Sequence, residues 1–221
     1  MLATHDSLTA YPVKSWWFGP FNFLCKCQDK TLEEQYHAGA RSFDLRFARY
    51  RGEWHAAHGA MIYRITLKEA LKTLAALPSP VYFRVLCEDT FYRKSCAGEL
   101  ARELVREINL QDTGSVRLKP LYVRSKRTWD LAAEFKYGKE CASFDTDPLT
   151  ENDRDSLCAK VARMYELQTP DDRLNFIGCY ESGGIPALSG LPYPRLAAKA
   201  LTPIALKKKW KENDVPVVDF L

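Results

Sequence analysis

Segments with strand periodicity and segments with helix periodicity alternate along the chain. In one of them, a helix predicted over Thr66 to Ala76, apolar residues recur at positions 67, 70, 71 and 74, the spacing of one helix face. Pro78 and Pro80 end the segment before the apolar run Val81 to Leu86. The same alternation predicts further helices over 32–38, 96–107, 153–166 and 194–211, and strands over 40–47, 53–57, 121–124, 174–180 and 215–220. Strands separated by helices pair in parallel with right-handed crossovers, so the pattern predicts an α/β fold of the (β/α)8 TIM-barrel type.

The first strand of this barrel is expected to be incomplete. Only Met1 to Thr4 precede the first ionisable pair, so the barrel is either trimmed or distorted there, or the chain starts late. No internal repeat is present, and the longest polar stretch, Asp145 to Asp155, is too short to link two domains. With 221 residues, of which 46% are hydrophobic, residues 1–221 are expected to form a single domain with a substantial core.

Charge does not call for a nucleic-acid partner, and the cysteine content favours a reducing compartment. The net charge of +4 is modest and its lysines and arginines are dispersed, so no nucleic-acid partner is expected, and a monomer is favoured. The seven cysteines lack the paired CxxC spacings of a zinc site, and we expect free thiols. The first residues have no signal-peptide pattern and no apolar run reaches about 18 residues. Free thiols favour the cytoplasm, although a mature secreted form would look the same at its N-terminus.

Ionisable residues follow several of the predicted strands. Because parallel barrels place their active sites at the carboxyl ends of the strands, these residues are expected to meet at one edge of the sheet. They are His5, Asp6, Asp44, Arg46, His58 and Asp219. Singly, each is weak evidence: a His-Asp pair before a serine, for example, occurs in turns where Asp or Ser caps the backbone. Together they suit phosphoryl transfer, in which one histidine accepts a proton, the other donates one, and an arginine neutralises the phosphorane charge.

Three ordered motifs extend this set: THDS at 4–7, EEQYHAGARSFDLRF at 33–47 and HAAHGAMIYRITLKEAL at 55–71. Their order and spacing resemble the X-domain of the bacterial, metal-independent phosphatidylinositol-specific phospholipases C. NFIGCYESGG at 175–184 and VPVVDFL at 215–221 are similar to two later strands of that family, whereas residues 86–173 show little likeness. The resemblance implies a TIM barrel that needs neither a metal nor another cofactor.

The resemblance also implies a role for each residue. His5 would be the general base, oriented by Asp219, and His58 the general acid, paired with Asp6. Arg46 would bind the phosphate, and Asp44 would hold Arg46 or share in proton handling. In that family the inositol 2-hydroxyl attacks its own phosphodiester, which releases diacylglycerol and a cyclic inositol phosphate.

Departures from the family pattern bear on the substrate. Ala3 stands where a glycine usually precedes Thr-His-Asp, and a family lysine near the end of the strand at 81–88 is replaced while Glu88 remains. The missing lysine weakens the case for phosphatidylinositol itself and favours a related or soluble phosphodiester. The candidates for substrate contacts are Glu88, Lys136, Asp145 and Tyr180.

Two alternative functions stay open at this point. A metal-dependent glycerophosphodiester phosphodiesterase would need a Glu-x-Asp metal pair, where this sequence has Asp44-Leu45-Arg46. A catalytically silent barrel that binds a phosphorylated ligand would have no chemical need for a second histidine.

An aromatic cluster, Trp16, Trp17 and Phe18, comes shortly after the His-Asp pair. Aromatic rims favour the bilayer interface, so these residues are candidates for transient contact with a membrane surface that carries the phospholipid substrate. The equally weighted alternative is that they cap the core of the barrel.

Overall fold

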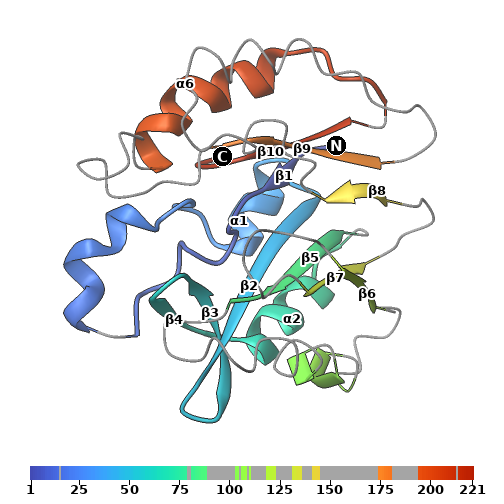
Figure 1. Ribbon diagram of the computed structural model, residues 1–221. Coiled ribbons are helices and arrows are strands. Elements are labelled where there is room, and N and C mark those ends of the chain that lie inside the picture. The colour runs from blue at the N-terminus through green and yellow to red at the C-terminus, as the bar shows by residue number, and fades with distance from the viewer. Residues whose placement is uncertain are drawn as a thin grey trace.

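The strands of the protein form one mixed sheet that curls into part of a barrel (Figure 1). The computed structural model describes residues 1–14, 16–78, 81–88, 103–104, 106–108, 110, 118–122, 131–135, 141–144, 174–180, 194–212 and 214–221. Within these residues the sheet has the order β6-β7-β5-β2-β1-β10-β9-β8, and β3 and β4 branch from β2. This is a mixed α/β architecture, as the sequence predicts.

The centre of the sheet is parallel. From one side to the other it contains β8 (Cys141–Phe144), β9 (Leu174–Cys179), β10 (Asp214–Val218), β1 (Ala3–Thr4), β2 (Ser42–Tyr50) and β5 (Tyr82–Cys87). The two-residue β1 confirms the expectation of a shortened first strand. It is nevertheless paired on both sides, because Thr4 lies opposite Phe43 of β2 and Val218 of β10.

Antiparallel strands flank this parallel centre. The predicted alternation of strands and helices did not include this antiparallel pairing. β3 (Glu53–His58) and β4 (Met61–Thr66) extend β2 as a meander, and β7 (Leu131–Phe135) pairs antiparallel with both β5 and β6 (Leu118–Tyr122). The turn between β2 and β3 has positive φ at Arg51 (51°) and Gly52 (88°), as in the tight turns that match the twist of antiparallel strands. The expected parallel strand over 121–124 therefore corresponds to the end of an antiparallel one.

Helices pack on the outer face of the curled sheet. α1 (Leu32–His37) and α2 (Leu67–Ala75) lie near β2 and β5, and α6 (Pro194–Lys207) lies over β9 and β10 (Figure 1). Both α1 and α2 begin with a capping box, in which a threonine and the glutamate three residues later satisfy each other's backbone N–H groups. α2 confirms the predicted helix, whereas α6 ends at Lys207, four residues earlier than expected.

The other predicted helices are only partly described. Residues 103–104, 106–108 and 110 are helical, at the end of the helix expected over 96–107. The helix expected over 153–166 lies outside the described residues. None of the helices in the described part of the chain is long and apolar enough to cross a bilayer.

Two of the apolar clusters among the described residues hold the sheet against its helices. The larger contains Phe43, Leu45 and Phe47 of β2, packed with Leu32 of α1 and Leu71 of α2. The smaller lies under α6 and includes Ile177, Leu201 and Val218. Because β2 is buried on both faces, it is anchored firmly, and the polar side chains that it carries near its centre are held in fixed positions.

Candidate active site

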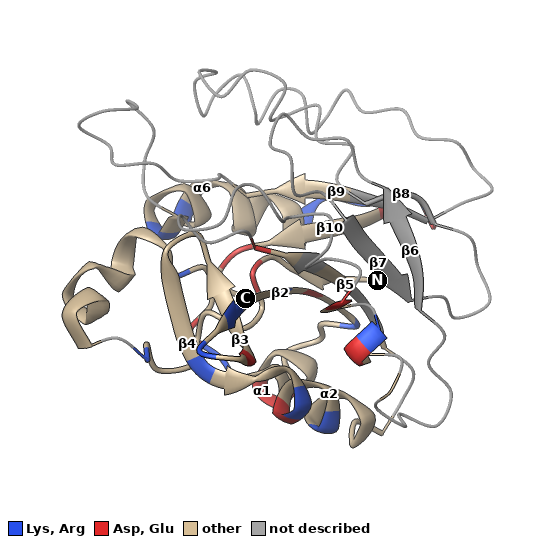
Figure 2. Ribbon diagram, turned by 60° about the horizontal axis from the view of Figure 1, so that its bottom comes forward, with Lys and Arg blue, Asp and Glu red and all other residues tan. Residues whose placement is uncertain are grey.

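The structure brings all six predicted catalytic residues together. Since Thr4 is in register with Phe43 and Val218, the next residues along the three strands, His5, Asp44 and Asp219, lie at one level of the parallel sheet. Arg46 lies two residues further along β2, on the same face as Asp44, and His58 ends β3. In Figure 2 several acidic segments, in red, lie inside the curl of the sheet between β10 and β5.

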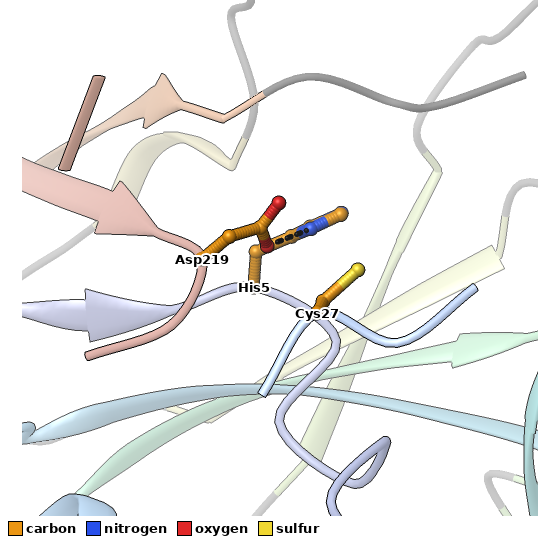
Figure 3. Close-up of side chains that lie close together, drawn as sticks. All are labelled: His5, Cys27 and Asp219. Atoms are coloured by element: carbon orange, nitrogen blue, oxygen red, sulfur yellow. Dashed lines mark hydrogen bonds and ion pairs between the residues drawn. The ribbon is translucent and has the colours of Figure 1, made fainter. Parts of the chain in front are cut away.

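His5 is buried and is held at both ring nitrogens. Its Nδ1 lies 2.8 Å from Oδ1 of Asp219, and its Nε2 lies 2.7 Å from Nη2 of Arg46 (Figure 3 shows the pair with Asp219). A guanidinium only donates hydrogen bonds, so Nε2 must be the acceptor and the ring proton belongs on Nδ1, directed at the carboxylate. The electron pair that a general base needs is therefore on Nε2, where it accepts a hydrogen bond from Arg46.

Two further groups fix the His5 ring and its backbone. Tyr180 stacks on the ring with a centroid distance of 3.5 Å and an interplanar angle of 9°. The side-chain amide of Gln28 donates to the carbonyl groups of His5 (3.0 Å) and Val218 (2.9 Å), which ties β1 to β10. Tyr180 was expected to contact substrate, and here it packs against the His5 ring.

Arg46 is shared among three buried carboxylates. Its Nε lies 2.6 Å from Oδ1 of Asp6, its Nη2 donates to Oδ2 of Asp44 at 2.9 Å, and its Nη1 donates to Oε1 of Glu88 at 3.3 Å. Burial alone would lower the pKa of the guanidinium, but the three carboxylates outweigh this and raise it well above its usual value. Asp44 holds Arg46, as predicted, and Glu88 does so as well.

His58 is the most exposed member of the set, with 20% of its side chain accessible. Its Nδ1 lies 2.7 Å from the carbonyl oxygen of Cys25 and 3.3 Å from Oδ2 of Asp6. The ring is edge-on to that of His5, with 6.4 Å between the centroids. Because a carbonyl only accepts, the Cys25 contact places a proton on Nδ1. The two histidines thus face one space from different strands, and both lie within 3.3 Å of Asp6.

Asp6 links the two histidines and has an unusual backbone. Its φ is 42°, in the left-handed region that Asp tolerates better than most residues, and this turn directs its side chain back towards Arg46 and His58. Burial raises the pKa of its carboxyl to about 6, although the positive charges of Arg46 and His58 oppose the rise. Burial likewise raises the pKa of Asp219 well above its usual value.

The raised pKa of Asp6 predicts a specific dependence of stability on pH. The folded state holds this proton more tightly than the unfolded state, whose pKa is near 3.8. Its stabilising contribution is therefore complete below about pH 4 and is lost as pH rises through about 6. We expect the free energy of unfolding of the wild type to fall by a few kcal/mol relative to that of Asp6→Asn across this window. Urea unfolding of both proteins at several pH values measures it, and a parallel pH dependence would contradict the assignment.

A layer of hydroxyl and amide groups supports the side chains of the candidate site. Ser7 Oγ accepts a hydrogen bond from the backbone N–H of Asp44 (2.9 Å) and donates one to the carbonyl of Thr4 (2.9 Å). Gln35 Nε2 donates a hydrogen bond to the carbonyl of Ser7 (2.8 Å). Ser7 and Gln35 lie inside the motifs singled out above, but their supporting role was not predicted. Gln28 lies outside those motifs and was missed altogether.

The remaining predicted contacts fall into two groups. Lys136 and Asp145 lie outside the described residues. The aromatic cluster forms the 3-10 helix η1 (Trp16–Leu24), where Trp16 is 72%, Trp17 66% and Phe18 37% exposed. The alternative that these aromatics cap the core is therefore wrong. Cys25, Cys27, Cys87 and Cys179 are thiols that are not joined in disulfides, as predicted.

Comparison with known proteins supports the fold. No family model and no curated relative matches the sequence. Among solved structures, the protein is similar to the phosphatidylinositol-specific phospholipase C of Listeria monocytogenes, with a TM-score of 0.61 and 14% identity over 99% of this chain and 87% of that one. It is also similar to the phosphatidylinositol-specific phospholipase C of Staphylococcus aureus, with a TM-score of 0.57 and 17% identity over 99% of this chain and 85% of that one. The chain thus shares the fold of bacterial phosphatidylinositol-specific phospholipases C.

Proposed function

We propose that the protein is a metal-independent phosphodiesterase that cleaves phosphatidylinositol, or a related phosphodiester, through a cyclic phosphate. The observation that carries the proposal is the state of His5, whose Nδ1 faces the Asp219 carboxylate while its Nε2 accepts from Arg46. A neutral, oriented imidazole beside a phosphate-binding cation is what proton abstraction next to a phosphodiester requires. The likeness of fold to bacterial phospholipases C supports the same conclusion, and we extend it to a closed (β/α)8 barrel for the complete sheet.

The reaction proceeds as an intramolecular transfer. His5 Nε2 removes the proton from a substrate hydroxyl adjacent to the phosphodiester, and that oxygen attacks phosphorus. The guanidinium of Arg46 exchanges part of its contact with carboxylates for the phosphoryl oxygens and neutralises the developing charge. His58, in its imidazolium form and paired with Asp6, donates a proton to the leaving alkoxide. The products are a cyclic phosphate and a free alcohol, which for a phosphatidylinositol is diacylglycerol.

Glu88 and Tyr180 bear on the substrate that this site would accept. Both lie at the catalytic groups, since Glu88 contacts Arg46 and Tyr180 stacks on His5. A carboxylate beside the phosphate-binding arginine can accept hydrogen bonds from the hydroxyl groups of a polyol headgroup. Lys136 and Asp145 remain predicted headgroup contacts.

The direct test is phosphorus NMR of the protein with phosphatidylinositol in mixed micelles, in the presence of a chelator. We expect the resonance of a cyclic inositol phosphate to appear. Strong inhibition by the chelator would point to the metal-dependent glycerophosphodiester type of enzyme. No turnover of phosphatidylinositol or of other glycerophosphodiesters would favour a binding barrel without activity.

The exposed aromatics of η1 are proposed to contact the lipid surface. Trp16 and Trp17 stack on each other at 3.6 Å between centroids, and Phe21 and Phe23 are more than half exposed on the same segment. η1 projects from the body of the protein beside the sheet (Figure 1). The similar S. aureus structures concern the modulation of membrane binding by that phospholipase C.

Replacement of these tryptophans should weaken binding to vesicles. Burial of a large apolar side chain contributes about 1.5–3 kcal/mol, so Trp16→Ala with Trp17→Ala should lower the partition coefficient at least roughly tenfold. Sedimentation with phosphatidylcholine vesicles that contain phosphatidylinositol measures this. Leu110→Ala is the matched control, because Leu110 is 71% exposed on another element. Equal binding by the double variant and the wild type would remove η1 from the membrane contact.

A further inference from the structure

Cys27 is a buried thiol at the active site for which the proposed reaction has no use. It is completely inaccessible to solvent, and it lies beside the His5–Asp219 pair (Figure 3). Its Sγ is 3.8 Å from Oδ2 of Asp6 and 3.9 Å from Nδ1 of His58, and these two atoms are 3.3 Å apart. A sulfur, a nitrogen and an oxygen from three separate segments of the chain thus converge around one point.

The separations match those of a tetrahedral zinc site. Zinc binds thiolate sulfur at about 2.3 Å, imidazole nitrogen at about 2.0–2.1 Å and carboxylate oxygen at about 2.0–2.2 Å. With tetrahedral angles, these bond lengths place sulfur about 3.6 Å from the nitrogen and from the oxygen, and the nitrogen about 3.4 Å from the oxygen. Each observed distance lies within a few tenths of an ångström of its ideal value, so side-chain adjustments alone could close the site.

The charge and the donor types of the site also suit this ion. Among the described residues, Asp6, Asp44 and Glu88 share the single guanidinium of Arg46, so the buried carboxylates around this point outnumber that cation. Thiolate and imidazole donors select zinc over calcium and magnesium, which prefer oxygen. Three protein ligands leave a fourth position for water or a substrate oxygen.

We propose that Asp6, Cys27 and His58 form a binding site for Zn²⁺, and that the bound ion inhibits the enzyme. On binding, the Cys27 thiol releases its proton to solvent. Nδ1 of His58 gives up its hydrogen bond to Cys25, releases its proton to solvent and coordinates the metal, so the ring keeps a proton only on Nε2. The inhibitory part rests on the proposed function, because a metal-bound neutral imidazole is a far weaker acid than the imidazolium that protonates the leaving alkoxide.

Cobalt(II) provides a direct test of the site. A cobalt–thiolate bond gives a charge-transfer absorption in the near ultraviolet, and four-coordinate cobalt gives intense visible bands. We expect the tag-free wild type to show both at one ion per chain, and added Zn²⁺ to abolish them. Cys27→Ser should lose the charge-transfer band and bind Zn²⁺ at least roughly 10–100-fold more weakly. Mutation of a residue that only supports a metal ligand already costs this factor, so loss of the ligand itself should cost no less. Cys25→Ser is the matched control and should retain the band, with circular dichroism as the check on folding.

The outcomes separate this inference from the proposed function. Absence of the charge-transfer band in the wild type, or its retention in Cys27→Ser, overturns the site whether or not the protein is an enzyme. If the protein turns over a phosphodiester, Zn²⁺ should stop turnover and a chelator should restore it. For Cys27→Ser, the rate with Zn²⁺ should stay close to the rate of the same variant without Zn²⁺. Turnover that persists with the metal bound overturns inhibition while the site stands. A cobalt band in a protein without turnover supports the site and counts against the proposed function.

Discussion

His5→Ala should remove turnover while leaving the fold intact. Loss of a positioned general base costs about 10²–10⁴-fold in kcat, and the cavity left by the imidazole lies among polar groups that water can satisfy. The measurement is the initial rate of cyclic phosphate formation, accompanied by thermal unfolding. His37→Ala is the matched control, because His37 is exposed on α1 and should be replaceable without effect.

Asp219→Asn tests the same assignment at nearly constant volume. An amide can donate to Nδ1, which would allow the ring proton to move to Nε2 and remove the acceptor that the base requires. We expect a rate loss approaching that of His5→Ala. Full activity in both variants would mean that another group accepts the proton.

His58→Ala should also lose about 10²–10⁴-fold in kcat on a lipid substrate. The reason differs from that for His5→Ala, because His58 is proposed to protonate the leaving group, and a second substrate tests this difference. An alkoxide leaves only when it is protonated, whereas nitrophenolate leaves readily without a proton. On an inositol phosphodiester with a nitrophenyl leaving group, His58→Ala should therefore recover most of the wild-type rate, and His5→Ala should not. If both variants respond alike to the leaving group, the two histidines do not divide the roles of acid and base.

Local chemistry made several elements predictable. α2 combines a clear helical spacing of apolar residues with a threonine cap and a glutamate three residues on, and its predicted bounds agree with Leu67–Ala75 to within one residue. The clustering of ionisable residues was predictable for a similar reason. Residues that directly follow parallel strands lie at the same edge of the sheet. That is why His5, Asp44 and Asp219 were expected together.

Elements that depend on long-range pairing were not predictable. β4 was missed because Arg64 is its one exposed residue, so its sequence shows almost no polar alternation. The direction of β7 depends on which strand lies beside it, and no local residue pattern determines that choice. Gln28 illustrates the same limit at the site, because its role is to bridge the carbonyls of His5 and Val218, which are 213 residues apart in the chain.

The pairing of β1 with β10 has a consequence for how the protein becomes active during synthesis. His5 leaves the ribosome well before Asp219, which lies 214 residues later and directly after β10. Until β10 is in place, β1 lacks one of its two neighbours and the imidazole has no carboxylate to orient it. The arrangement on which the proposed activity depends is therefore absent from the nascent chain until these two segments, 214 residues apart, have met.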